Sequence, residues 1–192
     1  CQRRDGARTE DSSVNPLTAY ARSKVWSEQG LAELAGPDFI VTCLRFATAC
    51  GASPRLRLDL VLNDFVASAL TSGVIRILSD GTPWRPLVHL QDIAQAFVAA
   101  LVAPREAVHD QAFNVGRTGE NFRIRQVAEM VAEVVPGCEV AFAPGASPDT
   151  RNYRVDFTKV ETRLPGYAPR WRLRQGIEEL YQAYRRHGLT RE

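Results

Sequence analysis

The sequence predicts an α/β protein, and three observations carry this prediction. Segments with helical spacing alternate with short apolar strands, which is the order expected for parallel strands joined by helices. The run FIVTCLRFATA at 39–49 is nearly continuous in apolar and β-branched residues, as in a strand covered on both faces. With 192 residues, 45% of them hydrophobic, the chain can bury one core and a small second lobe.

The first part of the chain is expected to run loop, helix, strand and helix. Residues 1–14 are polar and include turn-forming residues. A helix then follows from Pro16 to about Leu34, with Asn15 as a candidate cap, and the Gly-Pro pair at 36–37 ends it. After the strand at 39–49 come a basic loop at 53–59 and a helix at 60–73.

The second part continues the alternation and closes with two helical segments. Strands are expected at 74–78, 86–90, 112–116 and 138–144. Helices are expected at 91–104, 122–137, 157–166 and 173–188, with Pro or Gly at each stop. No internal repeat or low-complexity tract interrupts this order.

Composition argues against several classes of protein. The net charge is +2 and the arginines are dispersed, so nucleic acid is not an expected partner. No apolar run approaches the roughly 20 residues needed to cross a bilayer, so no membrane partner is expected. The four cysteines lack CxxC spacing, which argues against a metal site or a disulfide framework and favours free thiols in the cytoplasm.

Tyr20 and Lys24 are the main candidates for chemistry. Four residues apart on a helix, their phenol and ammonium converge on one face. A nearby cation lowers a tyrosine pKa from about 10, which lets the phenol exchange a proton with a substrate hydroxyl or carbonyl. This spacing alone occurs by chance in roughly one such chain in twenty, so the surrounding motifs must decide its meaning.

The surrounding motifs follow one another in a defined order. Pro16, Tyr20 and Lys24 match the pattern Pro-x-x-x-Tyr-x-x-x-Lys, and CLRFAT ends the next strand. Downstream come SDGTPWRPLVHLQD, FNVG and the C-terminal stretch from YRVDFTK to LRQGI. Together these motifs resemble the extended short-chain dehydrogenase/reductase family, and specifically its NAD-dependent epimerases and dehydratases of nucleotide sugars. The resemblance covers nearly the whole chain.

The resemblance implies roles at the cofactor. Tyr20 would be the catalytic acid–base residue, and Lys24 would hold the nicotinamide ribose and lower the tyrosine pKa. Phe46 and Ala47 would lie beside the nicotinamide at the end of their strand. The implied cofactor is NAD, and NADP fits these residues equally well because the residue that reads the ribose lies outside the matched motifs.

The resemblance also implies a nucleotide-diphosphate sugar as substrate, contacted by Thr48, Asn63, Arg85, Arg151 and Tyr153. Thr48 stands where relatives usually have an asparagine. Arg85 offers planar recognition of phosphate oxygens, with a surface arginine as the plainer alternative. Asn63 either contacts substrate or caps its helix.

Four other polar residues admit simpler interpretations. Arg55 and Arg57 either help to hold an anionic substrate or are solvated loop charges. His89 is expected to be packed or hydrogen-bonded rather than a base. Asp92 is expected to be a cap or a local anchor.

The sequence contains no Gly-rich turn of the GxxGxxG or GxGxxG type. We therefore expect the C-terminal portion of a larger enzyme, inactive alone and with an exposed sheet edge. Residues 1–60, with strands and a helix from 74–115, would complete a Rossmann-type parallel sheet. Residues 116–192 would form mainly a smaller α/β substrate-binding lobe and the C-terminal helices.

The predicted function is that of an NAD(P)-dependent nucleotide-sugar epimerase or dehydratase, homodimeric when intact. Two alternatives stand beside it. One is a ketoreductase of the same superfamily, and the other is a non-catalytic binding or regulatory protein that keeps the fold.

Overall fold

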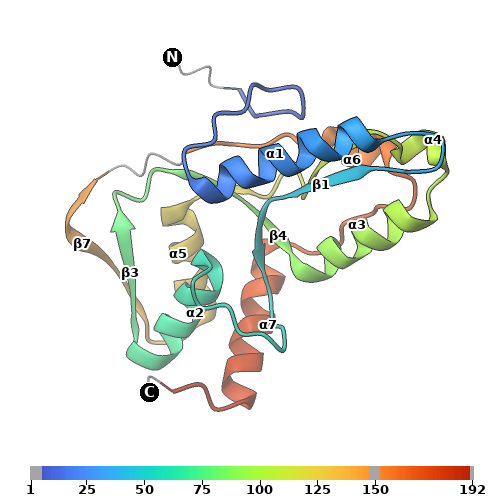
Figure 1. Cartoon of the computed structure of the whole chain (residues 1–192). Coiled ribbons are helices and arrows are strands. Elements are labelled where there is room, and N and C mark those ends of the chain that lie inside the picture. The colour runs from blue at the N-terminus through green and yellow to red at the C-terminus, as the bar shows by residue number, and fades with distance from the viewer. Residues whose placement is uncertain (1–5, 148–151, 191–192) are drawn as a thin grey trace.

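The computed structural model describes residues 6–147 and 152–190 (Figure 1). Its helices are α1 (Ala19–Leu34), α2 (Val61–Ser72), α3 (Leu90–Val102), α4 (Arg105–Val108), α5 (Ile124–Val134), α6 (Thr158–Arg163) and α7 (Leu173–Arg186). Its strands are β1 (Thr42–Phe46), β2 (Thr48–Cys50), β3 (Val74–Ser79), β4 (Trp84–His89), β5 (Gln111–Val115), β6 (Asn121–Arg123) and β7 (Glu139–Ser147).

The strands form three small, mostly parallel sheets. β1 pairs with β5, β2 pairs with β4, and β3 pairs with β7, all in parallel. β6 runs antiparallel to β4 on its other side. The predicted α/β class with parallel pairing is confirmed.

The lobe around β3 is built on three amphipathic helices. α2 and α5 pack against β3, and α7 packs against α2 and α5. Their apolar positions recur at three- and four-residue spacing, so each helix presents one stripe to a common core. Fully buried members of this core include Val66, Ile77, Val131, Ile177 and Leu180.

A second core lies beneath the β1–β5 pair. Phe113 and Val115 of β5 meet Phe157 and Val160 from the start of α6, and all four are fully buried. α3 adds its small residues to the same core. This core supports the strands whose carboxyl ends carry the predicted cofactor residues.

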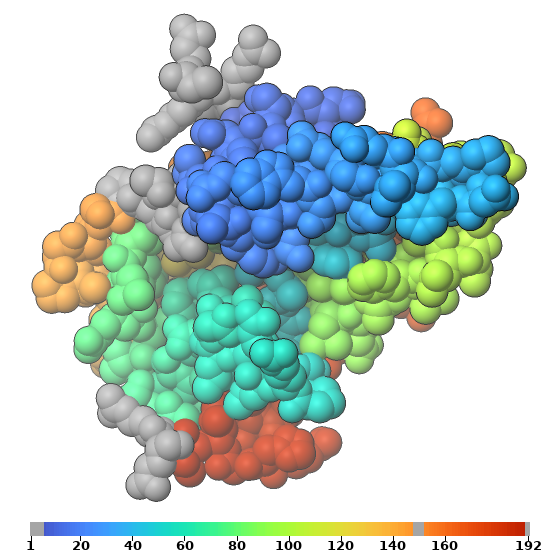
Figure 2. Space-filling model, in the orientation of Figure 1, coloured from blue at the N-terminus to red at the C-terminus, as the bar shows by residue number. Residues whose placement is uncertain are grey.

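α1 and part of α3 are far less covered. α1 has no buried residue and forms a ridge on the surface (Figure 2). On α3 the side chains of Phe97, Val98, Leu101 and Val102 are exposed. Among the described residues β1 has a single strand partner, β5, so its other edge is open, as expected from the sequence.

Several element boundaries differ from the sequence-based expectation. The expected strand at 39–49 divides at Ala47 into β1 and β2, because the Ala47 N–H donates to the carbonyl of Val115 (3.0 Å) while β2 turns to pair with β4. α1 begins after Thr18, which caps it in place of Asn15. β6 occupies residues assigned to a helix start, and the short α4 was not expected. In the described part of the chain, no helix has the length and apolarity to cross a membrane.

Candidate active site

Tyr20 and Lys24 lie on the first turns of α1. The Thr18 hydroxyl accepts a hydrogen bond from the Ala21 N–H (3.1 Å) and so fixes the start of the helix. The Lys24 ammonium lies 5.4 Å from the centroid of the Tyr20 ring, and Tyr20 is 73% exposed. Their expected convergence on one helix face is confirmed, and their catalytic roles stay a prediction.

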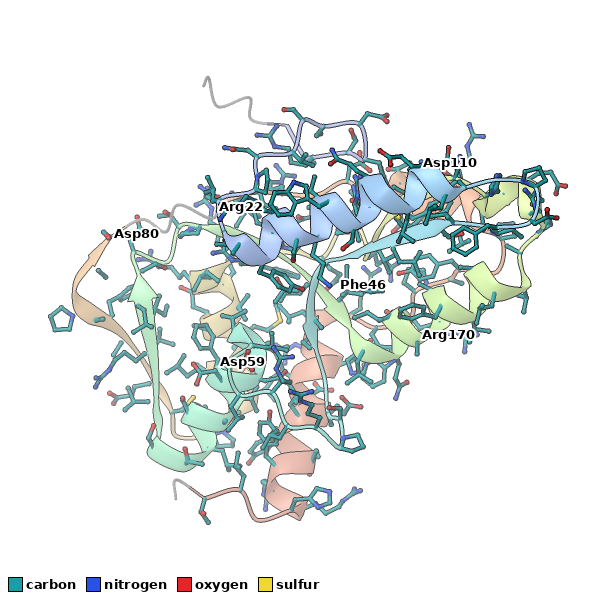
Figure 3. All side chains as sticks on the ribbon, viewed as in Figure 1. Arg22, Phe46, Asp59, Asp80, Asp110 and Arg170 are labelled. Atoms are coloured by element: carbon teal, nitrogen blue, oxygen red, sulfur yellow. The ribbon has the colours of Figure 1, made fainter. Side chains whose placement is uncertain are left out.

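The carboxyl end of β1 supplies the predicted nicotinamide contacts. Phe46 is the last residue of β1 and is 41% exposed (Figure 3). Its ring packs at a tilt against Phe97 of α3, with 5.3 Å between centroids. Ala47, the next residue, is buried. Ligands of parallel α/β folds bind at this end of the strands.

These residues fit the nicotinamide-ribose end of a dinucleotide. Within the described residues the Lys24 ammonium forms no ion pair, so its donors are available to hydroxyl groups. An exposed aromatic ring and a small buried residue lie at the strand end. No Gly-rich turn occurs in the sequence, so no residue of this chain is assigned to the pyrophosphate.

A cleft of about 600 Å³ brings three of the predicted substrate residues together. Thr48, Arg85 and Tyr153 all line it. The Arg85 guanidinium lies 6.0 Å from the centroid of the Tyr153 ring, and its Nη1 donates to the carbonyl of Trp84 (2.8 Å). The volume is in the range that holds small-molecule ligands.

The cleft also contains two charged residues that the sequence analysis did not assign. Asp59 and Arg76 contribute to its wall, together with Asp64 from the first turn of α2. Arg76 lies between the buried residues Ile75 and Ile77 on β3, so strict alternation along the strand was the signal that could have revealed it. Burial raises the pKa of the Asp64 carboxyl, and a hydrogen bond from Ser68 (3.4 Å) partly offsets this.

Arg57, on the loop before α2, is paired with a neighbouring carboxylate. Its guanidinium forms two hydrogen bonds with the Asp59 carboxylate, of 2.7 and 2.8 Å. This contact lowers the pKa of Asp59 to about 2 and raises the pKa of Arg57, to which the nearby Tyr20 phenol adds a smaller contribution. Arg57 is therefore paired rather than simply solvated, on a loop close to Tyr20.

One predicted substrate residue, Asn63, does not line this cleft. Asn63 is only 3% exposed, and its side-chain oxygen accepts the Gly51 N–H (3.3 Å). Its carbonyl also accepts the Tyr184 hydroxyl (3.5 Å), so Asn63 links α2 to a loop and to α7. Arg151 lies outside the described residues.

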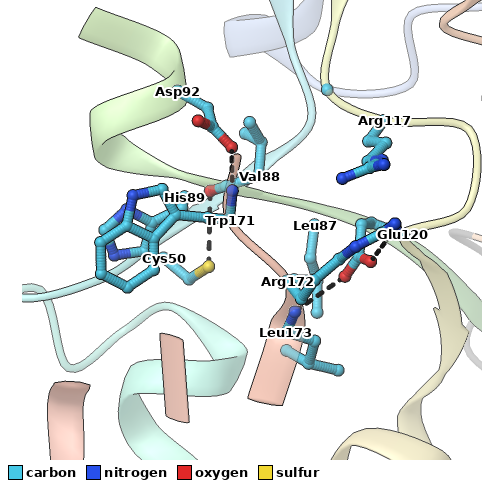
Figure 4. A pocket seen from close by; sticks show the side chains of 11 residues that line it. Cys50, Leu87, Val88, His89, Asp92, Arg117, Glu120, Trp171, Arg172 and Leu173 are labelled. Atoms are coloured by element: carbon cyan, nitrogen blue, oxygen red, sulfur yellow. Dashed lines mark hydrogen bonds and ion pairs between the residues drawn. The ribbon is translucent and has the colours of Figure 1, made fainter. Parts of the chain in front are cut away.

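His89 and Asp92 belong to a structural junction with a cavity of only about 10 Å³ (Figure 4). The His89 ring stacks on Trp171 with 3.7 Å between centroids, and its Nε2 lies 2.8 Å from a Glu179 carboxylate oxygen. Asp92 accepts the N–H groups of Arg170 and Trp171. The anchoring interpretation is confirmed for both residues, and the cavity is too small for a substrate.

Gly51 shows why this junction is tight. Its φ is +117°, and a Cβ atom there would lie 2.5 Å from His89 Nε2. Only glycine combines this backbone conformation with so close an approach.

This chain aligns with only part of the length of its curated relatives. UDP-glucose 4-epimerase of Mycolicibacterium smegmatis is 30% identical over 181 residues, which are 92% of this chain and 56% of the relative. UDP-glucuronic acid decarboxylase 1 of Arabidopsis thaliana is 28% identical over 142 residues, or 72% of this chain and 31% of the relative. The chain thus spans about a third to a little over half of these proteins.

The fold itself is that of the Rossmann-type nucleotide-sugar enzymes. The structure of MoeE5 in complex with UDP-glucuronic acid and NAD superimposes with a TM-score of 0.80 and 27% identity, covering 96% of this chain and 61% of MoeE5. Residues 2–116 match the profile of the NAD dependent epimerase/dehydratase family. The chain belongs to this family.

Proposed function

We propose that this chain carries the Tyr–Lys pair and the substrate cleft of an NAD-dependent nucleotide-sugar epimerase or dehydratase. The observation that carries the proposal is that α1 presents Tyr20 and Lys24 together, while Thr48, two residues after the end of β1, lines the cleft with Arg85 and Tyr153. The activity belongs to a polypeptide that also supplies the rest of the sheet and the pyrophosphate site.

The substrate side follows from charge and shape. Arg85 can hold a diphosphate through its planar donors, and Tyr153 keeps the guanidinium in place through its ring. Thr48 contributes a hydroxyl at the cleft wall. We take a uridine diphosphate sugar as the substrate class, because the related proteins named above act on or bind such molecules.

The chemical step uses Tyr20 as the proton acceptor and Lys24 as the residue that holds the cofactor ribose. Bound NAD supplies the means of taking up a hydride from a sugar carbon and returning it. As that C–H bond breaks, the Tyr20 phenolate accepts the proton of the hydroxyl on the same carbon, and a keto sugar forms. The Lys24 ammonium would donate hydrogen bonds to the ribose hydroxyls. Epimerisation and dehydration both begin with this oxidation.

The exposed surfaces of α1, β1 and α3 support the proposal that further strands of the sheet pack against them. α1 buries no side chain, β1 has an open edge among the described residues, and the apolar residues of α3 face outward. We propose that further strands of the same fold lie along β1 between these two helices. A homodimer formed through α1 stays a prediction.

The test is Tyr20→Phe in the full-length protein, assayed with UDP-glucose and UDP-glucuronic acid. We expect turnover to fall by about 10²–10⁴-fold, the usual contribution of a general acid–base group, while the Kd for NAD stays within about threefold. Tyr181→Phe, on α7, is the matched control and should leave turnover unchanged. Full turnover in Tyr20→Phe would overturn the catalytic assignment.

A further inference from the structure

α1 carries the proposed catalytic pair, but few contacts hold this helix against the rest of the protein. It buries no side chain, and its first turn contains no acidic residue. The Ser23 and Ser27 hydroxyls bond back to the carbonyls of Tyr20 (2.8 Å) and Ser23 (2.9 Å), which weakens a helix slightly. A helix of 16 residues is marginal in water without tertiary contacts, so its few contacts matter.

The best-defined of these contacts is made by Arg45 of β1. Its Nε donates to one carboxylate oxygen of Glu28 (3.0 Å), and its Nη2 contacts the other. Its Nη1 donates to the carbonyl of Glu10 in the loop before α1 (3.0 Å). Guanidinium and carboxylate meet side by side, which fixes direction as well as distance.

The contacts continue into the neighbouring strand. A carboxylate oxygen of Glu10 accepts the backbone N–H of Asn114 (2.7 Å). Asn114 is the residue of β5 that stands opposite Arg45 in the parallel register. We call Glu10, Glu28, Arg45 and Asn114 the Arg45 cluster, and it joins α1, the preceding loop, β1 and β5.

The cluster is placed so that it can orient the catalytic pair. Tyr20, Lys24 and Glu28 follow one another at four-residue spacing, so each lies one turn along α1 and about 40° around it from the last. Arg45 directly precedes Phe46, the predicted nicotinamide contact. Fixing Glu28 on Arg45 therefore fixes both the rotation and the position of Tyr20 relative to the end of β1.

We propose that Arg45 and Glu28 are positioning residues for the oxidation step, holding the Tyr20–Lys24 helix against the carboxyl end of β1. The inference rests on the proposed function. Displacing a reacting group by about 1 Å costs roughly 100-fold in rate. Because neither residue touches substrate in this arrangement, their loss should lower kcat more than it weakens binding.

The experiment compares Arg45→Gln, Glu28→Gln and the double variant in the full-length protein. Each single variant should lower kcat by about 100-fold, with KM and the Kd for NAD within about threefold. The double variant should be little worse than either single one, because both remove the same contact. Arg45→Lys should recover part of the activity, and Glu33→Gln, an exposed control on α1, should be unaffected. Additive losses, or a fall in NAD binding equal to the fall in kcat, would overturn the proposal.

Amide hydrogen exchange separates this inference from the proposed function. In Arg45→Gln the amides of α1 should exchange at least about tenfold faster, while those of α7 stay as in the unsubstituted protein. This holds whether or not the protein turns over a nucleotide sugar. Absence of turnover in the unsubstituted protein would refute the function alone, and unchanged exchange in α1 would refute the role of the Arg45 cluster.

Discussion

Helices α1 and α7 are similar in length but are held in place by different forces. α7 has 14 residues and buries four large side chains, of Leu173, Ile177, Leu180 and Tyr184. Its start is fixed by the buried carboxylate of Glu120, which accepts the Leu173 N–H (2.8 Å). α1 has 16 residues and buries none, and its best-defined tie to the sheet is the polar Arg45 cluster.

Because of this difference, most of the stability comes from one part of the molecule, and the proposed catalytic pair lies on another. The lobe that forms most of the substrate cleft is held by apolar burial, which is strong and non-directional. The helix with the proposed catalytic pair is held by directional polar contacts, which place a group well but add little stability. Substitutions in the two helices should therefore affect different measurements.

The largest expected effect is on stability. Leu180→Ala removes a fully buried side chain from the lobe core and should lower the free energy of unfolding by about 2–5 kcal/mol. Leu34→Ala removes a side chain that is 65% exposed at the end of α1, and the change should stay within about 0.5 kcal/mol. Urea unfolding followed by circular dichroism measures both. Equal losses would mean that α1 is as well packed as α7.

The second prediction compares the reactivity of two thiols, one in the lobe core and one on β1. Burial raises the pKa of Cys50, in the lobe core, to about 12, whereas Cys43 on β1 is only partly buried. At pH 8 a thiol with that pKa is about one part in 10⁴ thiolate, the form that reacts. Cys43 should react with a disulfide reagent at least about 100-fold faster.

The measurement is labelling followed by mass spectrometry of the peptides around each cysteine. Cys50→Ser serves as the control that assigns the slow phase. Comparable rates for Cys43 and Cys50 would show that the lobe core opens to solvent as readily as β1.

Local spacing was sufficient to predict the elements and the Tyr–Lys convergence. The helix pattern placed Tyr20 and Lys24 on one face because four residues make just over one turn. The apolar run before Ala47 predicted a strand of a parallel sheet, and β1 does pair in parallel with β5, although its residues are only partly buried. The His89 and Asp92 anchors were also predictable, because a histidine on a strand and an acid near a helix start are usually bonded.

What could not be predicted depends on partners distant in the sequence. The division of the strand at Ala47 arises because β2 pairs with β4, and nothing in the apolar run marks that point. Asn63 lies at the start of a helix, where a polar residue is usually exposed, but the Gly51 loop folds over it. Asp59 reaches the cleft only because the loop between β2 and α2 runs along its wall.

The smallest expected effect concerns Asp156, where the loop before α1 meets the C-terminal half. Its backbone N–H donates to the carbonyl of Arg8 (2.9 Å), and its carboxylate accepts the Thr158 N–H (2.7 Å) at the start of α6. Bonds from the Thr158 hydroxyl and N–H lower the pKa of Asp156 below its usual value near 4. The ionised carboxylate therefore favours the folded state above about pH 4, and this contribution is lost as the pH falls through the lowered pKa.

Asp156→Asn should accordingly reduce stability at pH 7 by at most about 0.5 kcal/mol, because water screens a part-exposed carboxylate. The difference from the unsubstituted chain should shrink as the pH falls below about 4, where both side chains are neutral in the unfolded state. Thermal unfolding at pH 7, 5 and 3 measures it, with Asp38→Asn in the loop after α1 as the control. A difference that grows toward pH 3 would show that Asp156 has a raised pKa, and hence that its surroundings at the start of α6 are apolar rather than polar.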